Sequence, residues 1–314
     1  MQRQNSGLNV ERETAVTSDI MQGRKVDGDV IGGDKITVGD IEGGYTVVGT
    51  GAQLTVNIHN EAPPTPEKPK LAIEPDMTFI PSGFFVMGSD EDTPEESPQH
   101  AVNLPDFHIS IYPITNEEFA QFIWKTGRAA STALRWHGNE PPNGKLRHPV
   151  TGVTWYEALA YCEWLSALSG RQYALPSEAQ WEKSARGADG RLFPWGNDWD
   201  AARCNAAYDV ITPVDAYPAQ SVYGCFDMVG NGREWTTTIW GSDARHPDKI
   251  TAYPWQDDRR NELSEPSTTR RIFRGGRAKE PHGFRCTARN GYLPEKSGPK
   301  RNRHGFRVVL LPTI

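Results

Sequence analysis

Helix signals in this 314-residue chain are confined to the stretch between Thr115 and about residue 190, and this limits the folds that the chain can adopt. Three segments there begin with Ser or Thr followed three residues later by Glu or Gln, the spacing of a capping box. They start at Thr115, Thr154 and Ser177, and Gly127 and Gly170 end the first two predicted helices. From about residue 190, Gly, Pro and aromatic residues replace the helical periodicity. The sequence therefore predicts an α+β fold dominated by irregular loops.

Short strands are predicted on both sides of this helical stretch. Two of them flank the turn at residues 81–83, within "MTFIPSGFFVMGS". Others are expected within "EWTTTIW", "RIFRGG" and "GFRVVLL", which are rich in β-branched and aromatic residues. We expect these strands and the helices to belong to one large domain.

The N-terminal fifth of the chain has a different character. Gly-Asp recurs at 28–29, 33–34 and 39–40 between short β-branched runs such as Val47-Val48, which predicts very short strands and tight turns. The segment "EAPPTPEKPK" contains four prolines and is typical of an extended linker. We therefore predict a flexible N-terminus (1–22), a Gly-rich β-element (23–60), a linker (61–72) and one large domain (73–314).

Composition excludes several classes of protein. No run of 18 apolar residues is present, so no membrane-spanning helix is expected. The polar N-terminus has no apolar core of the kind that a secretory signal needs, so we expect a cytoplasmic location. The four cysteines form no CxxC pair, and we interpret them as small buried hydrophobic residues.

Positive charge is concentrated near the C-terminus of a chain whose net charge is -6. Residues 271–307 contain eleven Lys and Arg but only two acids, Glu280 and Glu295. Such a segment can bind nucleic acid or a small anion. The interpretation we favour is that its arginines pair with acids elsewhere in the fold.

Eight motifs follow one another along the chain: "FIPSGFFVMGS", "YPITNEEFAQF", "HPVTGVTWYEALAYCEWL", "RQYALPSEAQWEKSARG", "FPWGN", "GCFDMVGNGREWT", "RGG" and "RNRHGFRVV". Together they resemble the formylglycine-generating enzyme (sulfatase-modifying factor) family, which has a C-type-lectin-like fold. The resemblance covers about three-quarters of the chain and implies that fold for residues 73–314.

The catalytic centre of the family is absent from the matching positions. The family's enzymes use two copper-binding cysteines between the RGG motif and an Arg-Cys that matches Arg285-Cys286. Counting along the chain places these cysteines at Glu280 and Pro281, and neither side chain supplies a thiolate. We therefore expect no copper and no catalytic residues. The alternative of a formylglycine-type oxidoreductase with a displaced site would need Cys204 and Cys225 to converge.

The resemblance implies a calcium site at the corner "DMVGNGREW". Oxygen ligands from side chains and turn carbonyls suit Ca²⁺. The predicted ligands are Val229, Asn231, Gly232 and Glu234. The alternative is that Asn231 is a turn residue and that Glu234 pairs with an arginine.

An RGG motif at 274–276 and a terminal GFRVV at 305–309 bracket the C-terminal loops. In this bracket the chain resembles the variable proteins of diversity-generating retroelements, which carry a ligand-binding surface between two such motifs. The predicted ligand-binding residues in this bracket are Arg277, Ala278, Lys279, Glu280, His282, Tyr292 and Lys296.

These observations predict a non-catalytic, ligand- or protein-binding module whose surface comes from C-terminal loops at about 277–304. It is a candidate for a retroelement-diversified variable protein, or for a sensor or adaptor in a bacterial signalling or defence system. The β-element at 23–60 is expected to contact a partner protein or copies of itself. Binding of nucleic acid or an anion through 271–307 is a further alternative, in which nucleic acid is the less expected ligand.

Overall fold

The structure is a computed structural model in which the chain forms two units, Met1–Pro69 and Lys70–Ile314, each described by itself. The border between them falls inside the predicted linker. In the described part of the chain no helix has the length and apolar character needed to cross a membrane. The described residues are 10–11, 35–36, 45–49, 52–56, 72–91, 93–207, 210–245, 247, 259–275, 281–295 and 304–311.

Two antiparallel strand pairs make up the described part of the N-terminal unit. Strand β1 (Val10–Glu11) pairs with β2 (Lys35–Ile36), and β3 (Tyr45–Gly49) pairs with β4 (Ala52–Val56). Strand β3 contains the predicted strand residues Val47-Val48. Strand β1 lies within residues 1–22, where we predicted no regular element. Its partner is far along the chain, so the local sequence does not reveal the pairing.

The three predicted helices are confirmed. They are α1 (Asn116–Thr126), α2 (Trp155–Ser169) and α3 (Glu178–Arg186), and each begins with a complete capping box. Gly127 and Gly170 follow α1 and α2 with positive φ angles of 67° and 66°. Glycine adopts this left-handed conformation without the strain that a Cβ would cause, so both helices end there.

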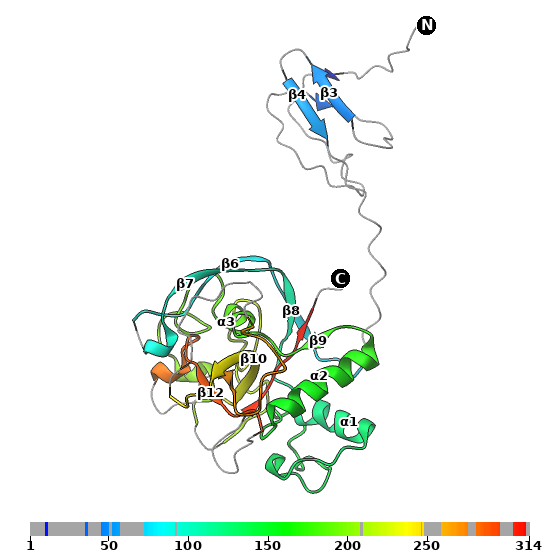
Figure 1. Ribbon diagram of the computed structural model, residues 1–314, viewed down its shortest axis with the longest axis vertical. Helices are drawn as coiled ribbons and strands as arrows, with labels where there is room; N and C mark the ends of the chain where they lie inside the picture. Colours follow the sequence, from blue (N-terminus) through cyan, green and yellow to red (C-terminus); the bar gives the residue numbers. More distant parts are fainter. Residues whose placement is uncertain are drawn as a thin grey trace. The chain divides into compact units, whose positions relative to one another are not determined.

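Strands from distant parts of the sequence form the sheets of the larger unit (Figure 1). One sheet has the order β5-β8-β14-β9, formed by β5 (Met77–Ile80), β8 (Phe107–Ser110), β14 (Val309–Leu310) and β9 (Tyr173–Ala174). A second has the order β12-β11-β10-β13, formed by β12 (Asn290–Tyr292), β11 (Arg270–Arg274), β10 (Arg233–Gly241) and β13 (His304–Gly305). Strands β6 (Gly83–Met87) and β7 (His100–Leu104) form a hairpin.

Single-turn 3-10 helices and irregular loops connect these elements. The 3-10 helices in the described part span Pro94–Glu96, Thr132–Leu134, Ala201–Arg203 and Pro281–Phe284. Between α3 and β10 the described chain is otherwise irregular. The predicted α+β class with long loops is confirmed.

The buried interior has two parts that differ in chemistry. On one side, α1 and α2 pack together, and the rings of Phe119, Phe122, Tyr161 and Phe306 contact one another with centroids 5.3–6.2 Å apart. We call these four residues the aromatic core. On the other side, α3 packs against β6, β10 and β11, and charged side chains share its interior with apolar ones.

Candidate functional site

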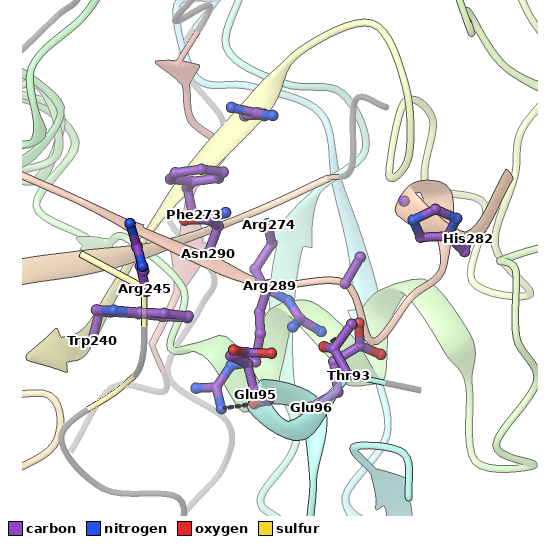
Figure 2. Close-up of a pocket in the computed structure, with 13 residues that line it drawn as sticks. Thr93, Glu95, Glu96, Trp240, Arg245, Phe273, Arg274, His282, Arg289 and Asn290 are labelled. Atoms are coloured by element: carbon purple, nitrogen blue, oxygen red, sulfur yellow. Dashed lines mark hydrogen bonds between the residues drawn. The ribbon is translucent and has the colours of Figure 1, made fainter. Parts of the chain in front are cut away.

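A cavity of about 370 Å³ opens beside β10 and β11 (Figure 2). One wall comes from the 3-10 helix Pro94–Glu96 and the preceding Thr93, which we call the turn at 93–96. The other walls come from both strands, from the 3-10 helix at 281–284 and from residues 288–290. In Figure 2, Trp240 and Arg245 lie on one side of the hollow, Glu95, Glu96 and Thr93 along another, and His282 lies apart from both groups. The lining residues are Thr93, Glu95, Glu96, Arg233, Trp240, Arg245, Phe273, Arg274, His282, Gly283, Ala288, Arg289 and Asn290.

Arg274, the arginine of the RGG motif, is held behind the pocket by two carboxylates of α3. Its Nη1 atom lies 3.2 Å from Glu178 Oε1, and its Nη2 atom lies 2.5 Å from Glu182 Oε2. All three side chains are buried. Arg274 also donates to the carbonyls of Cys286 and Thr287, so it ties β11 to α3 and to the loop that follows.

Arg289 connects the same layer to the pocket wall. Its Nη2 atom lies 2.6 Å from Glu178 Oε2, and its Nη1 atom donates to the carbonyl of Glu95 at 3.0 Å. The guanidinium also lies over the Trp240 ring, 5.8 Å from its centroid. Arg289 therefore fixes the turn at 93–96 against α3. Arg186 pairs with Glu182 at 3.0 Å in the same layer. We call Glu178, Glu182, Arg186, Arg274 and Arg289 the ionic layer.

A glycine allows the turn at 93–96 to approach α3. Gly88 has a φ of 78°, and a Cβ there would lie 2.6 Å from the Glu96 carbonyl oxygen. Its N–H donates to Glu182 Oε1 (2.9 Å), and its carbonyl accepts from Arg186 Nη1 (2.9 Å). No other residue type fits this close approach without strain.

Glu96 places a buried carboxyl at the pocket wall. Its Oε2 atom has no hydrogen-bond partner of standard geometry in the described part of the chain. Burial raises the pKa of the Glu96 carboxyl, while the nearby Thr287 hydroxyl and Arg274 guanidinium act in the opposite direction. The ionised form of Glu96 is therefore less favourable than that of a carboxyl in water.

Only part of the predicted ligand surface lies in the described residues. His282 is exposed and lines the pocket, as expected of a ligand contact. Tyr292 does not line it: its half-buried ring packs on His304 with centroids 5.0 Å apart. Arg277, Ala278, Lys279, Glu280 and Lys296 lie outside the described residues. The role of these seven residues in binding stays a prediction.

Sequence reasoning missed most of the pocket. Arg289 is one of the eleven basic residues counted in 271–307, and that count was the only signal for it. Glu95, which accepts from Arg289, lies 194 positions before it in the sequence, and Glu96 is its neighbour. No periodicity in the sequence connects the two segments.

Four arginines of the basic segment contact other parts of the fold. Arg274, Arg289 and Arg307 form ion pairs with Glu178, Glu182 and Glu234. Arg271 stacks on Trp155, 4.1 Å from the ring centroid, and donates to the carbonyl of Thr237. These contacts agree with the interpretation that the arginines pair with acids elsewhere in the fold.

At the predicted calcium corner, protein donors already contact the proposed oxygens. Glu234 Oε1 and Oε2 lie 2.8 and 2.6 Å from Arg307, and Oε2 also accepts from Trp181 Nε1. Asn231 Oδ1 accepts from the Thr212 N–H at 2.9 Å, and the Val229 carbonyl accepts from a Gln220 amide. In this arrangement both Glu234 carboxylate oxygens accept from the buried Arg307 guanidinium, which agrees with the alternative that Glu234 pairs with an arginine. Gly232 completes the predicted set, and calcium binding at this corner stays a prediction.

The four cysteines are free thiols in the apolar interior, as expected from their spacing. Burial raises the pKa of the Cys204 thiol to about 12 and also raises the pKa values of the other three. Within the described ranges, no group of three or more His, Cys, Asp or Glu side chains is arranged to hold a metal ion.

Comparison with known proteins shows the family. Residues 62–311 match the family described as the sulfatase-modifying factor enzyme 1-like domain. The chain belongs to this formylglycine-generating-enzyme family and has its C-type-lectin-like fold.

The related sequences include catalytic and inactive members. The formylglycine-generating enzyme of Bos taurus is 29% identical over 302 residues, which cover 76% of this chain and 75% of that protein. The inactive C-alpha-formylglycine-generating enzyme 2 of Mus musculus is also 29% identical, over 70% of this chain and 88% of that protein. Overall identity therefore does not separate the two classes.

A further relative is much longer than the matching region. The serine/threonine-protein kinase Pkn1 of Chlamydia trachomatis is 34% identical over 256 residues. These cover 74% of this chain but only 38% of the kinase's length, so this chain corresponds to about two-fifths of that protein.

Two solved structures share the fold. PvdO from Pseudomonas aeruginosa has a TM-score of 0.58 and 26% identity, over 76% of this chain and 95% of that one. Variable protein 1 of Treponema denticola has a TM-score of 0.56 and 18% identity, over 87% of this chain and 100% of that one. At 18% identity the second likeness concerns the fold alone.

Proposed function

We propose that the chain is a non-catalytic binding module, which presents its C-terminal loops at about 277–304 and the pocket beside them to a ligand. The state of the cysteines carries this proposal. The position that the family resemblance assigns to the second catalytic cysteine is Pro281, in the 3-10 helix Pro281–Phe284. The cysteines that the chain does have are buried, and their raised pKa values disfavour the thiolates that copper(I) binding and thiol oxidation require.

The competing function is an oxidoreductase of the formylglycine type with a displaced site. It would use Cys204 and Cys225, the cysteines outside the expected loop. Both thiols lie in the same apolar cluster, and burial raises both pKa values. A thiol in such surroundings is structural more often than reactive. We therefore place this function second.

A diversified ligand surface is the finer form of the proposal. The retroelement-type bracket from 274–276 to 305–309 encloses His282, Ala288, Arg289 and Asn290 of the pocket wall. The fold shared with the Treponema denticola variable protein 1 supports a frame that presents variable loops. We include in the proposal a role as sensor or adaptor, with residues 23–60 contacting a partner or another copy.

The experiment is a copper-dependent oxidation assay on a cysteine-containing peptide, with metal content measured on the same sample. The formylglycine-generating enzyme of Bos taurus is the positive control. We expect no aldehyde product and no stoichiometric copper from this chain. Turnover with bound copper would overturn the proposal. Measured calcium content would at the same time test the predicted cation site.

A further inference from the structure

We propose that the pocket binds a carboxylate of a polypeptide ligand, supplied by an Asp or Glu side chain or by a chain terminus. This inference rests on the proposed binding function and names the chemical group that the site recognises. The first support is the charge of the described wall. Four arginines line it, Arg233, Arg245, Arg274 and Arg289, against the carboxylates of Glu95 and Glu96. A wall with this excess attracts an anionic group.

Two of these arginines, Arg274 and Arg289, also belong to the ionic layer behind the wall, where they pair with Glu178 and Glu182. Counted once each, the described residues of wall and layer hold five guanidiniums, including that of Arg186, against four carboxylates, so one positive charge remains. The side chains of the ionic layer are buried or nearly so, and buried charges are screened only weakly by solvent and salt. Burial raises the pKa of the Glu96 carboxyl, which disfavours its ionised form. Glu96 therefore offsets less of the positive charge than an exposed glutamate would. The excess positive potential therefore reaches the cavity.

The accessible donors lie on separate elements around the opening. Arg245 is exposed just beyond β10, Asn290 is exposed on β12, and His282 is exposed on the 3-10 helix at 281–284. Arg245 lies beside Trp240 in Figure 2, and the apolar rings of Trp240 and Phe273 make up part of the wall. A guanidinium offers two parallel N–H groups to a carboxylate, and an apolar surround strengthens the interaction.

The acids of the wall favour a carboxylate on a polypeptide over a phosphate on a nucleic acid. Glu95 and Glu96 stand together on the turn at 93–96, across the hollow from Arg245 in Figure 2. The same acids can accept hydrogen bonds from the backbone N–H groups of a polypeptide. A nucleic acid has phosphates but no such adjacent amide donors.

The test is a calorimetric titration of the whole chain with four probes. They are N-acetylglutamate N-methylamide, its glutamine counterpart, N-acetylglycine and inorganic phosphate. We expect saturable binding of one or both carboxylate probes, weaker binding of phosphate and none of the glutamine compound. The two carboxylate probes distinguish a side chain from a chain terminus. Tighter binding of phosphate, or no binding of either carboxylate, overturns the proposal.

The variant that tests the site is Arg245→Gln, because this exposed side chain lies outside the ionic layer. Loss of a charge-assisted hydrogen bond should weaken carboxylate binding about tenfold. The matched control is Arg147→Gln, an exposed arginine paired with Asp215 at 2.7 Å, and it should bind like the natural chain. Unchanged binding by Arg245→Gln contradicts the proposal, provided that circular dichroism shows both variants folded.

The titration tests the ligand class, and the oxidation assay tests the non-catalytic function, so each can be refuted without the other. The titrations contain no copper and measure no oxidation. Absent carboxylate binding without oxidase activity would refute only the ligand class. Copper-dependent turnover together with carboxylate binding would refute only the non-catalytic function.

Discussion

Phe306 and Arg307 are neighbours in the sequence, both fully buried, yet they belong to interiors of opposite chemistry. Phe306 packs edge-on against Tyr161 in the aromatic core, with centroids 5.3 Å apart. Arg307 pairs with Glu234 and donates to the carbonyls of Ser110 and Phe226. The four residues of the aromatic core carry no charge and pack by apolar burial. The charged interior depends on matched partners, and its ionic layer adjoins the candidate site.

The sharpest way to test this contrast is to substitute the two neighbours separately. Phe306→Ala should lower the free energy of unfolding by about 3–5 kcal/mol through cavity formation. Arg307→Met should cost about as much, roughly 3–5 kcal/mol, because it leaves the Glu234 carboxylate buried and unpaired. Urea denaturation measures both values.

A second substitution separates the two mechanisms. Adding Glu234→Gln to Arg307→Met removes the unpaired charge and should recover part of the lost stability. Adding Glu234→Gln to Phe306→Ala should recover none, because the cavity remains and the Arg307 pair is broken. Equal responses of the two backgrounds would show that the interiors do not differ as described.

Asp227 predicts a dependence of stability on pH that is specific to the charged interior. Burial raises the pKa of its carboxyl to about 7, against the opposing effects of Asn231 and Arg307. The unfolded value is about 3.9, so the folded state holds the proton more tightly. The stability from this group is therefore full below about pH 4 and is lost as the pH rises through about 7, by at most about 4 kcal/mol.

The variant Asp227→Asn should remove this dependence. Asparagine keeps an oxygen that can accept from Asn231 Nδ2, and it tolerates the positive φ of 52° at this position. Urea unfolding of both proteins between pH 4 and pH 8 gives the measurement. Parallel curves for the two proteins would contradict the assignment of the pH dependence to Asp227.

On the aromatic side a smaller effect is expected from the helix cap. Thr115 accepts from the Glu118 N–H at 3.2 Å, and the Glu118 carboxylate accepts from the Thr115 N–H at 2.7 Å. Thr115→Ala removes one half of this box and should cost about 1 kcal/mol. Thermal unfolding measures the loss, and Thr115→Ser, which keeps the hydroxyl, is the control. A loss as large in the serine variant would assign the effect to packing.

The smallest effect is expected at an exposed ion pair. Arg147 and Asp215 lie 2.7 Å apart, with about half of each side chain exposed. Arg147→Met should change the unfolding free energy by less than about 1 kcal/mol. Added salt should reduce this difference further, whereas the cost of Arg307→Met should respond little. A cost near that of Arg307→Met would remove the distinction between buried and exposed pairs.

Much of the frame could be predicted from local patterns. The three capping boxes located α1, α2 and α3, and the stop glycines marked the ends of the first two. The spacing of the cysteines indicated buried thiols, which the structure confirms for all four. The motif order also indicated the family, which the match over residues 62–311 confirms.

Only part of the candidate site could be predicted from the sequence. His282 was predicted as a ligand contact and does line the pocket. The partners of the RGG arginine were not predicted, because Arg274 and Glu182 are 92 positions apart. Glu234 was predicted either as a calcium ligand or as the partner of an arginine, and its carboxylate accepts from Arg307, 73 positions away. Either role suits a glutamate beside a turn, so the local pattern could not choose between them.

The chain's own residues were enough to specify the helices, the buried thiols and the class of fold. A capping box closes over four residues, and a buried stripe repeats within one helix, so both can be recognised in a short window. The tertiary structure alone decided which carboxylate meets which guanidinium and where a charged pocket opens. Ion pairs between distant segments depend on how strands and helices are brought together, and no local pattern in the sequence encodes which segments meet.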